Sequence, residues 1–213
     1  MLLNEIMSKE IPGLRQSKKE LDRGNDPLNK KKWNKLGGGL QSRAYSPINT
    51  NNAVKLVNIA GTKDPSYQFI RMCSKHQDNP YFPKIFKVTK YPLAAGLSKK
   101  VLNTDKLVVT MERLERFISS DIIKVEQAFG IRFGNFIKNM TDEEASRYLQ
   151  TKLFKDPTWR AGVIKTTKDP HLKQAMRLLE PLFRHYQPDM HFGNIMMRGI
   201  GENRHMVFID PTM

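Results

Sequence analysis

The segment between residues 171 and 186 constrains the fold of this chain more than any other. Its apolar side chains recur at steps of three and four residues; they are Leu172, Met176, Leu179, Leu182, Phe183 and Tyr186. This period places them along one face of a helix, and such a face packs against a core. Pro188 disfavours the helical conformation in the residue before it. The sequence therefore predicts a core helix over 171–186 that ends at a loop.

The segment after this helix is polar and then turns back as a hairpin. Asp189 and Asn194 lie five residues apart on one loop, so both side chains can face the same cavity. Apolar runs at 195–197 and 206–209 flank a glycine-containing turn, and the second run ends at Asp210. We expect a helix, a polar loop and a two-stranded hairpin with acids at its ends.

These side chains suit the transfer of a phosphoryl group, which requires a positioned acceptor hydroxyl and metal between the phosphates. The carboxylate of Asp189 can orient and deprotonate the hydroxyl, and His191 can donate a hydrogen bond to the phosphoryl group. The amide oxygen of Asn194 and the carboxylate of Asp210 are hard ligands for Mg²⁺. Gly193 permits a tight backbone turn beside the phosphate. Taken singly, each residue is more typical of an ordinary polar turn; the ordered set favours catalysis.

Short β-rich runs separated by turns make up the first half of the chain. They lie at 33–36, 42–45, 53–57, 84–90 and 106–111. Residues 64–77, between the third and fourth runs, have loosely helical spacing. The pattern predicts a five-stranded antiparallel sheet with one helix.

The turn between the first two runs is rich in glycine and fits G-x-G-x-x-S from Gly37 through Gly39 to Ser42. Backbone N–H groups of such a turn can approach phosphate oxygens because no side chain intervenes. Lys55 lies within the apolar run at 53–57, where its ammonium group can point towards the α- and β-phosphates of a nucleotide. The alternatives are a plain hairpin turn and a solvent-facing lysine.

The last run of the sheet and the expected helix bear on the same nucleotide site. Met111 would line an adenine pocket and the backbone near Glu112 would bond the purine, although an ordinary core strand explains the apolar residues equally well. A glutamate on the helix would normally pair with Lys55, but residues 56–80 contain none. Gln68 is the best-placed polar residue there. Either another group orients the lysine, or the lysine acts unaided, or catalysis is weak.

Three segments resemble the early protein kinase of T7-like bacteriophages. They are Leu36–Ser46, Ala53-Val54-Lys55, and Asp189–Met196 together with Ile209-Asp210-Pro211; Phe69–Met72 is also similar. The resemblance covers about residues 33–90 and 180–213. It implies a serine/threonine protein kinase that uses ATP and Mg²⁺ and is made early in infection. Such a kinase modifies host proteins, including transcription and translation machinery, in the host cytoplasm.

By this resemblance, Lys55 contacts ATP, Asp189 is the catalytic base, and Asn194 and Asp210 bind the metal. The implied fold is α+β and two-lobed, like that of a protein kinase, with a reduced C-lobe that ends just after the metal-binding aspartate. Its expected parts are a basic extension at 1–32, a sheet-based N-lobe at 33–112 and a minimal helical C-lobe at 113–213.

Two alternatives to a protein kinase stay open. Only three residues follow Asp210, whereas the family continues into further kinase sequence, so we expect substrate docking by residues 113–184, by the extension, or not at all. The loop at 189–194 also resembles that of aminoglycoside and lipopolysaccharide-core kinases, which makes a small-molecule kinase one alternative. The other is a pseudokinase that inhibits a host enzyme such as RNA polymerase. The missing glutamate and short tail favour it, and the complete polar set argues against it.

The charge of the chain bears on its partners. It carries 36 Lys and Arg against 21 Asp and Glu, a net charge of +15, and this excess attracts polyanions. The densest basic stretch, Lys30, Lys31, Lys32 and Lys35, fits a solvated face or a nucleic-acid contact, but no motif supports the latter. The single Cys73 excludes a disulfide framework. No apolar run approaches the roughly 20 residues of a membrane span, and residues 1–5 lack the apolar core of a secretory signal.

Overall fold

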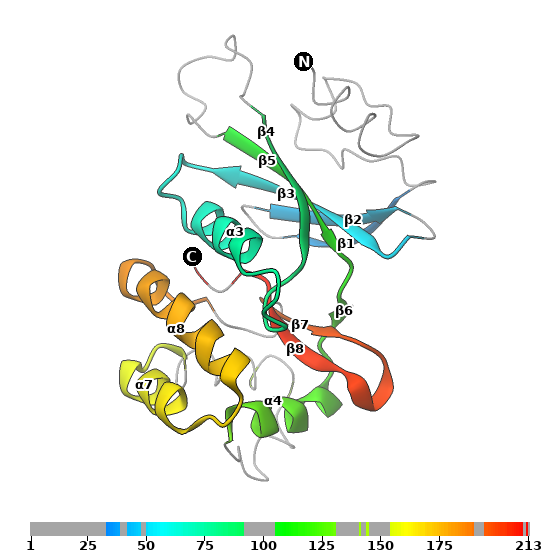
Figure 1. The fold of residues 1–213 in the computed structure, drawn as a ribbon. Helices are drawn as coiled ribbons and strands as arrows, with labels where there is room; N and C mark the ends of the chain where they lie inside the picture. The colour runs from blue at the N-terminus through cyan, green and yellow to red at the C-terminus, as the bar shows by residue number, and fades with distance from the viewer. Residues whose placement is uncertain are drawn as a thin grey trace. The chain divides into compact units, whose positions relative to one another are not determined.

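The computed structural model describes residues 33–38, 42–47, 50–91, 105–130, 141, 144, 154–189, 194–210 and 212. These residues form a mixed α+β protein whose strand pairs are antiparallel (Figure 1). The described residues of Met1–Ala60 and Phe86–Arg113 make up one compact unit, and those of Gly61–Ile85 and Leu114–Met213 make up a second. The α+β class predicted from the sequence is confirmed.

The first unit contains a five-stranded sheet in the order β1-β2-β3-β5-β4. Its strands are β1 (Trp33–Gly38), β2 (Ser42–Pro47), β3 (Asn52–Ile59), β4 (Ile85–Tyr91) and β5 (Asp105–Glu112). Each corresponds to one of the five β-rich runs of the sequence. The central strands β3 and β5 contribute most of the buried residues of this sheet, and Val54, Val57, Leu107 and Val109 expose 1% of their surface or less.

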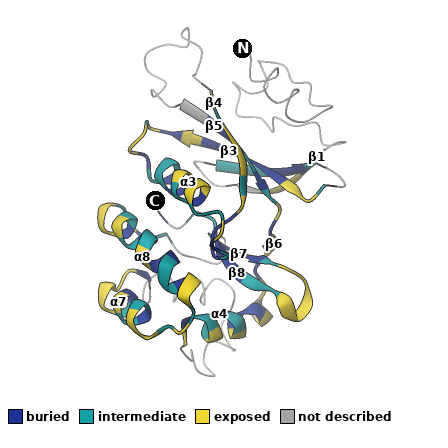
Figure 2. Ribbon diagram, in the orientation of Figure 1, coloured by how far each residue is buried: buried dark blue, intermediate teal, exposed yellow. Residues whose placement is uncertain are grey.

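The second unit contains the described helices and a three-stranded sheet in the order β6-β7-β8. The helices are α3 (Pro65–Lys75), α4 (Ile122–Phe129), α7 (Pro157–Thr166) and α8 (Pro170–His185). The strands are β6 (Glu115–Arg116), β7 (Ile195–Arg198) and β8 (His205–Phe208). The predicted core helix is confirmed as α8, which buries one side that includes Leu172, Met176, Leu179 and Phe183 (Figure 2).

Three of these helices begin in the same way. Asp64, Asp156 and Asp169 each precede a proline, and each side chain accepts a hydrogen bond from the backbone N–H two residues on. The aspartate satisfies donors that have no partner inside the helix, and proline suits the first helical position because its nitrogen has no hydrogen to leave unpaired. A reciprocal pair of hydrogen bonds, the pattern of a capping box, also joins Thr141 and Glu144: the N–H group of each residue donates to the side chain of the other.

Residues 61–85, which the sequence analysis placed in the N-lobe, pack with the second unit because the turn before β4 is anchored there. The hydroxyl of Tyr81 donates to Asp169 at 2.5 Å, and the amide of Asn79 donates to the carbonyl of His171 at 2.9 Å. The guanidinium group of Arg198 on β7 donates to the carbonyls of Pro80 and Phe82 in the same turn. These bonds attach the turn to both α8 and β7.

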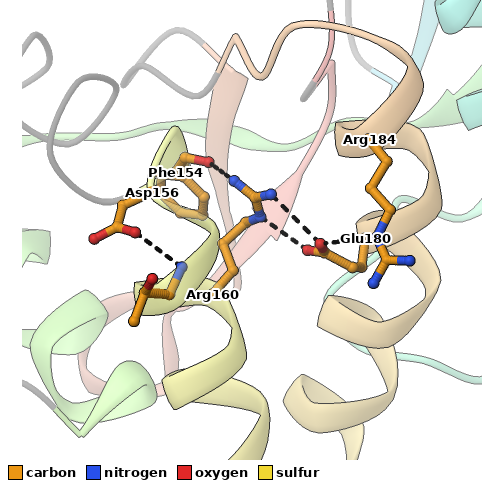
Figure 3. Close-up of polar contacts among 6 residues, drawn as sticks. Phe154, Asp156, Arg160, Glu180 and Arg184 are labelled. Carbon is orange, nitrogen blue, oxygen red and sulfur yellow. Dashed lines mark hydrogen bonds and ion pairs between the residues drawn. The ribbon is translucent and has the colours of Figure 1, made fainter.

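A buried arginine joins α7 to α8 (Figure 3). Arg160 exposes 4% of its surface, and its Nε lies 2.8 Å from Oε2 of Glu180. The same guanidinium donates to the carbonyl of Phe154 at 2.6 Å and lies over the ring of Phe183. Arg184 reaches the other oxygen of Glu180 at 3.4 Å from a largely exposed position. The two helices are therefore held by a paired and hydrogen-bonded charge.

Candidate functional site

The hairpin of β7 and β8 brings two of the predicted site residues to the same end of the second unit's sheet. Asn194 directly precedes β7, and Asp210 lies two residues beyond the end of β8. Ile195 pairs with Phe208, and the N–H of Ile209 donates to the carbonyl of Asn194 at 3.1 Å. Strand pairing therefore places residues 194 and 209 side by side, and Asp210 is the next residue along the chain after 209.

Asp189 joins them through a side-chain contact. The amide nitrogen of Asn194 donates to the backbone carbonyl of Asp189 at 2.6 Å and to its carboxylate Oδ2 at 3.2 Å. An amide group presents its donors and its acceptor oxygen on opposite sides, so this contact turns Oδ1 of Asn194 away from Asp189. The amide oxygen then becomes the atom that can meet a cation.

Ser66 is a residue of this region that the sequence analysis missed. It lies in the first turn of α3 and exposes 3% of its surface, and its Oγ donates to Oδ1 of Asp210 at 3.4 Å. Nothing in the sequence marked it, because a serine after Asp-Pro reads as part of an ordinary helix start. The contact joins residues 144 positions apart.

The donor set suits a hard cation. Among the described residues, no group of three His, Cys, Asp or Glu side chains is placed to hold a metal ion. The set of Asp210, Asn194 and Asp189 offers carboxylate and amide oxygens instead, and Mg²⁺ commonly uses one or two carboxylates while it keeps several waters. Asp210 and Asn194 would hold the ion, as the sequence predicted, and Asp189 would face the acceptor hydroxyl.

In the first unit, several predicted nucleotide-binding residues share a stretch of sheet. Lys55 on β3 is opposite Ala44 on one side and Val109 on the other, and Gly37 is opposite Ala44. Directly opposed residues, and residues two apart on a strand, lie on the same face of a sheet. Because Ala53 is opposite Met111, the side chains of Lys55 and Met111 lie on one face.

The remaining candidates lie at the edges of that stretch or outside the described residues. Ser42 is opposite Val57 at the start of β2, and Glu112 ends β5 opposite Asn52. Gly39, His191 and Gly193 fall outside the described residues, so their predicted roles stay predictions.

The helix after Lys55 offers no carboxylate. The sequence of α3 contains no acidic residue, and Asp64 before it caps the helix by accepting from the N–H of Ser66 and Tyr67. The side-chain amide of Gln68 donates to the carbonyl of Thr62, in the turn before the helix. The polar groups of this region are therefore engaged with the helix start and with Asp210.

The comparisons with known proteins assign no family to this chain, so its function is argued from its own residues. No family model matches the chain, and the search of curated proteins found no match. In the part of the chain that the structure describes, no helix has both the length and the apolar character of a membrane span.

Proposed function

We propose that this chain is an ATP- and magnesium-dependent phosphotransferase with a two-lobed, protein-kinase-like architecture. The observation that carries the proposal is the contact of Asn194 with Asp189, combined with the strand pairing that sets Asn194 beside Ile209, the residue before Asp210. An acid, an amide and a second acid then occupy one region, as the transfer of a phosphoryl group to a hydroxyl requires.

Each residue has a definite role in this proposal. Asp189 orients the acceptor hydroxyl and takes its proton, and Asn194 and Asp210 hold Mg²⁺. Bound Mg²⁺ would neutralise charge that develops on the phosphate oxygens. Lys55 and the turn from Gly37 to Ser42 contact the phosphates, and Met111 with the backbone near Glu112 contacts adenine. His191 donates to the transferred group.

The acceptor in this proposal is a serine or threonine hydroxyl of a host protein, and the setting is early bacteriophage infection in the host cytoplasm. The resemblance of the glycine turn, the lysine strand and the Asp189–Met196 loop to the phage kinases supports this part. The net charge of +15 fits an acidic protein substrate, because opposite charge raises the rate of encounter.

The test is transfer of the terminal phosphate of labelled ATP, with Mg²⁺, to bacterial lysate by wild type, Asp189→Asn, Lys55→Met and Asp78→Asn. Asp78 is exposed and serves as the matched control for loss of one acid. We expect labelled protein bands with wild type and Asp78→Asn, and loss of label with the other two. Label in small molecules alone would replace the protein acceptor by a small-molecule kinase. Label that persists in Asp189→Asn would contradict the assigned base.

A further inference from the structure

The first turn of α3 meets Asp210 through a hydroxyl that the helix itself does not need. The carboxylate of Asp64 already accepts from the backbone N–H groups of Ser66 and Tyr67, at 2.9 and 3.4 Å. The side chain of Ser66 is therefore separate from the cap. Its Oγ donates to Oδ1 of Asp210 at 3.4 Å, which is longer than the usual O–H···O distance of roughly 2.5 to 3.0 Å, in a partly buried environment.

The position of this turn is fixed by the same elements that carry the site. Tyr186, at the C-terminal end of α8, donates from its hydroxyl to the carbonyl of Lys63. Gln68 and Asp64 bond back to the carbonyls of Thr62 and Gly61. Tyr186 precedes Asp189 by three residues, so one anchor holds both the start of α3 and the loop that leads to the proposed base.

We propose that Ser66 is a positioning residue for the metal ligand Asp210. By donating to Oδ1, it restricts the rotation of the carboxylate that would hold the cation. The inference rests on the proposed function, because it assigns Asp210 to Mg²⁺. It also gives α3 a role in the site that does not depend on an acidic residue, since this helix has none.

The physical reason is the entropy that the Asp210 carboxylate loses when it binds a cation. A carboxylate that is held by one oxygen loses less rotational freedom when the other oxygen binds a cation. Hydrogen bonds to ligating carboxylates typically change metal affinity by a factor of roughly 10 to 100. Because the contact is long, we expect an effect at the lower end.

The experiment measures Mn²⁺ binding to the full chain by electron paramagnetic resonance, with and without a non-hydrolysable ATP analogue. Ser66→Ala should raise the dissociation constant about tenfold. Ser66→Thr, which keeps the hydroxyl, should bind like wild type. Ser74→Ala is the matched control, because Ser74 lies on the same helix and its hydroxyl bonds only within it, to the carbonyl of Ile70. It should bind Mn²⁺ like wild type.

The outcomes separate this inference from the proposed function. Equal Mn²⁺ affinity in wild type and Ser66→Ala would overturn the inference and leave the kinase assignment standing. Loss of affinity in Ser66→Thr equal to that in Ser66→Ala would also overturn it, because the hydroxyl would then be irrelevant. Tenfold weaker Mn²⁺ binding in Ser66→Ala, in a protein that transfers no phosphate, would support the inference and remove the proposed function. A wild type that binds no Mn²⁺ would overturn both.

Discussion

The side-chain amide nitrogen of Asn194 donates to Asp189 twice, to its backbone carbonyl at 2.6 Å and to its carboxylate at 3.2 Å. One side chain therefore fixes both the course of the loop and the direction of the acid. It also determines where its own oxygen points. A substitution at Asn194 should consequently affect metal binding and the orientation of Asp189 together.

Asn194→Ala should lower phosphate transfer by at least roughly 100-fold, because it removes a proposed metal ligand and the group that contacts Asp189. The measurement is the initial rate at several Mg²⁺ concentrations, since a lost ligand raises the concentration needed for half-maximal rate. Asn203→Ala, at an exposed position in the hairpin turn, is the matched control and should behave like wild type. A full rate for Asn194→Ala at saturating Mg²⁺ would contradict the assigned role in orienting Asp189.

The ion pair between Arg160 and Glu180 should contribute more to stability than any exposed pair of the second unit. Glu180→Ala leaves a buried guanidinium without its carboxylate and should cost about 3 kcal/mol of unfolding free energy. Arg184→Ala removes the other partner of Glu180, but its side chain is 74% exposed. Exposed pairs contribute little, so this control should cost about 0.5 kcal/mol. Urea denaturation of the two variants measures the difference.

The ion pair of Arg160 with Glu180 also predicts that the folded state loses stability in acid. Burial alone would raise the pKa of Glu180, but its hydrogen bond to Arg160, the charge of Arg160 and the nearby Arg184 outweigh burial and hold the pKa below its ordinary value of 4.5. A lowered pKa in the folded state gives stability that is present above the ordinary value and is lost as pH falls through the folded value. The stability advantage of wild type over Glu180→Gln should therefore be constant above pH 5.5 or so and shrink below about pH 4.5. A constant difference down to pH 3 or so would contradict this.

The contact of Tyr81 with Asp169 should make the folded state less stable at alkaline pH. Burial, the hydrogen bond to Asp169 and the charge of that carboxylate all raise the pKa of Tyr81 above its ordinary value of 10.0. A raised pKa gives stability that is complete below the ordinary value and is lost as pH rises through the folded value. Tyr81→Phe should cost about 1.5 kcal/mol at pH 8 or so, and the difference from wild type should shrink above pH 10.

The control for this prediction is Tyr67→Phe. Tyr67 lies on α3, and its ring hydroxyl makes no contact with Asp169. This variant should follow wild type at every pH in urea denaturation from about pH 8 to 11. If Tyr81→Phe also had the unfolding free energy of wild type across that range, the hydrogen bond from the Tyr81 hydroxyl to Asp169 would contribute nothing to stability.

The elements that were predicted from the sequence are those set by local pattern. The five strands, the stripe of α8 and the hairpin from 195 to 209 follow from residue periodicity and turn residues, and these act within a few positions of each other. The start of α7 could also have been found, because Asp156-Pro157 repeats the signal that begins α3 and α8.

The features that could not be predicted depend on contacts between distant residues. Residues 61–85 belong with the second unit because Arg198 and Asp169 bind the turn at 79–82, and no local pattern reports such bonds. The contact of Ser66 with Asp210 is of the same kind. For the candidate site, the sequence predicted which side chains to consider, and the pairing of β7 with β8 sets Asn194 beside Ile209.

Gly199 should be essential to that register. Its φ of +93° is outside the range that other residues favour, and a Cβ there would lie 2.5 Å from the backbone oxygen of Asn203. Gly199→Ala should therefore cost about 3 kcal/mol from backbone strain and overlap. Because the turn sets the pairing of β7 with β8, it should also weaken Mn²⁺ binding by Asn194 and Asp210. Gly201→Ala is the matched control, because Gly201 has a φ of +58° and open space around a Cβ.

The control variant should cost only about 1 kcal/mol, the usual penalty for a left-handed residue with a side chain. It should leave Mn²⁺ affinity unchanged, since the backbone of the turn need not move. Urea denaturation gives the two free energies, and titration with Mn²⁺ gives the affinities. Equal costs for the two alanine variants would show that the turn relaxes around residue 199. The pairing of Ile195 with Phe208 would then have to be held by the strands alone, and Asn194 would stay beside Asp210 whatever residue occupied the turn.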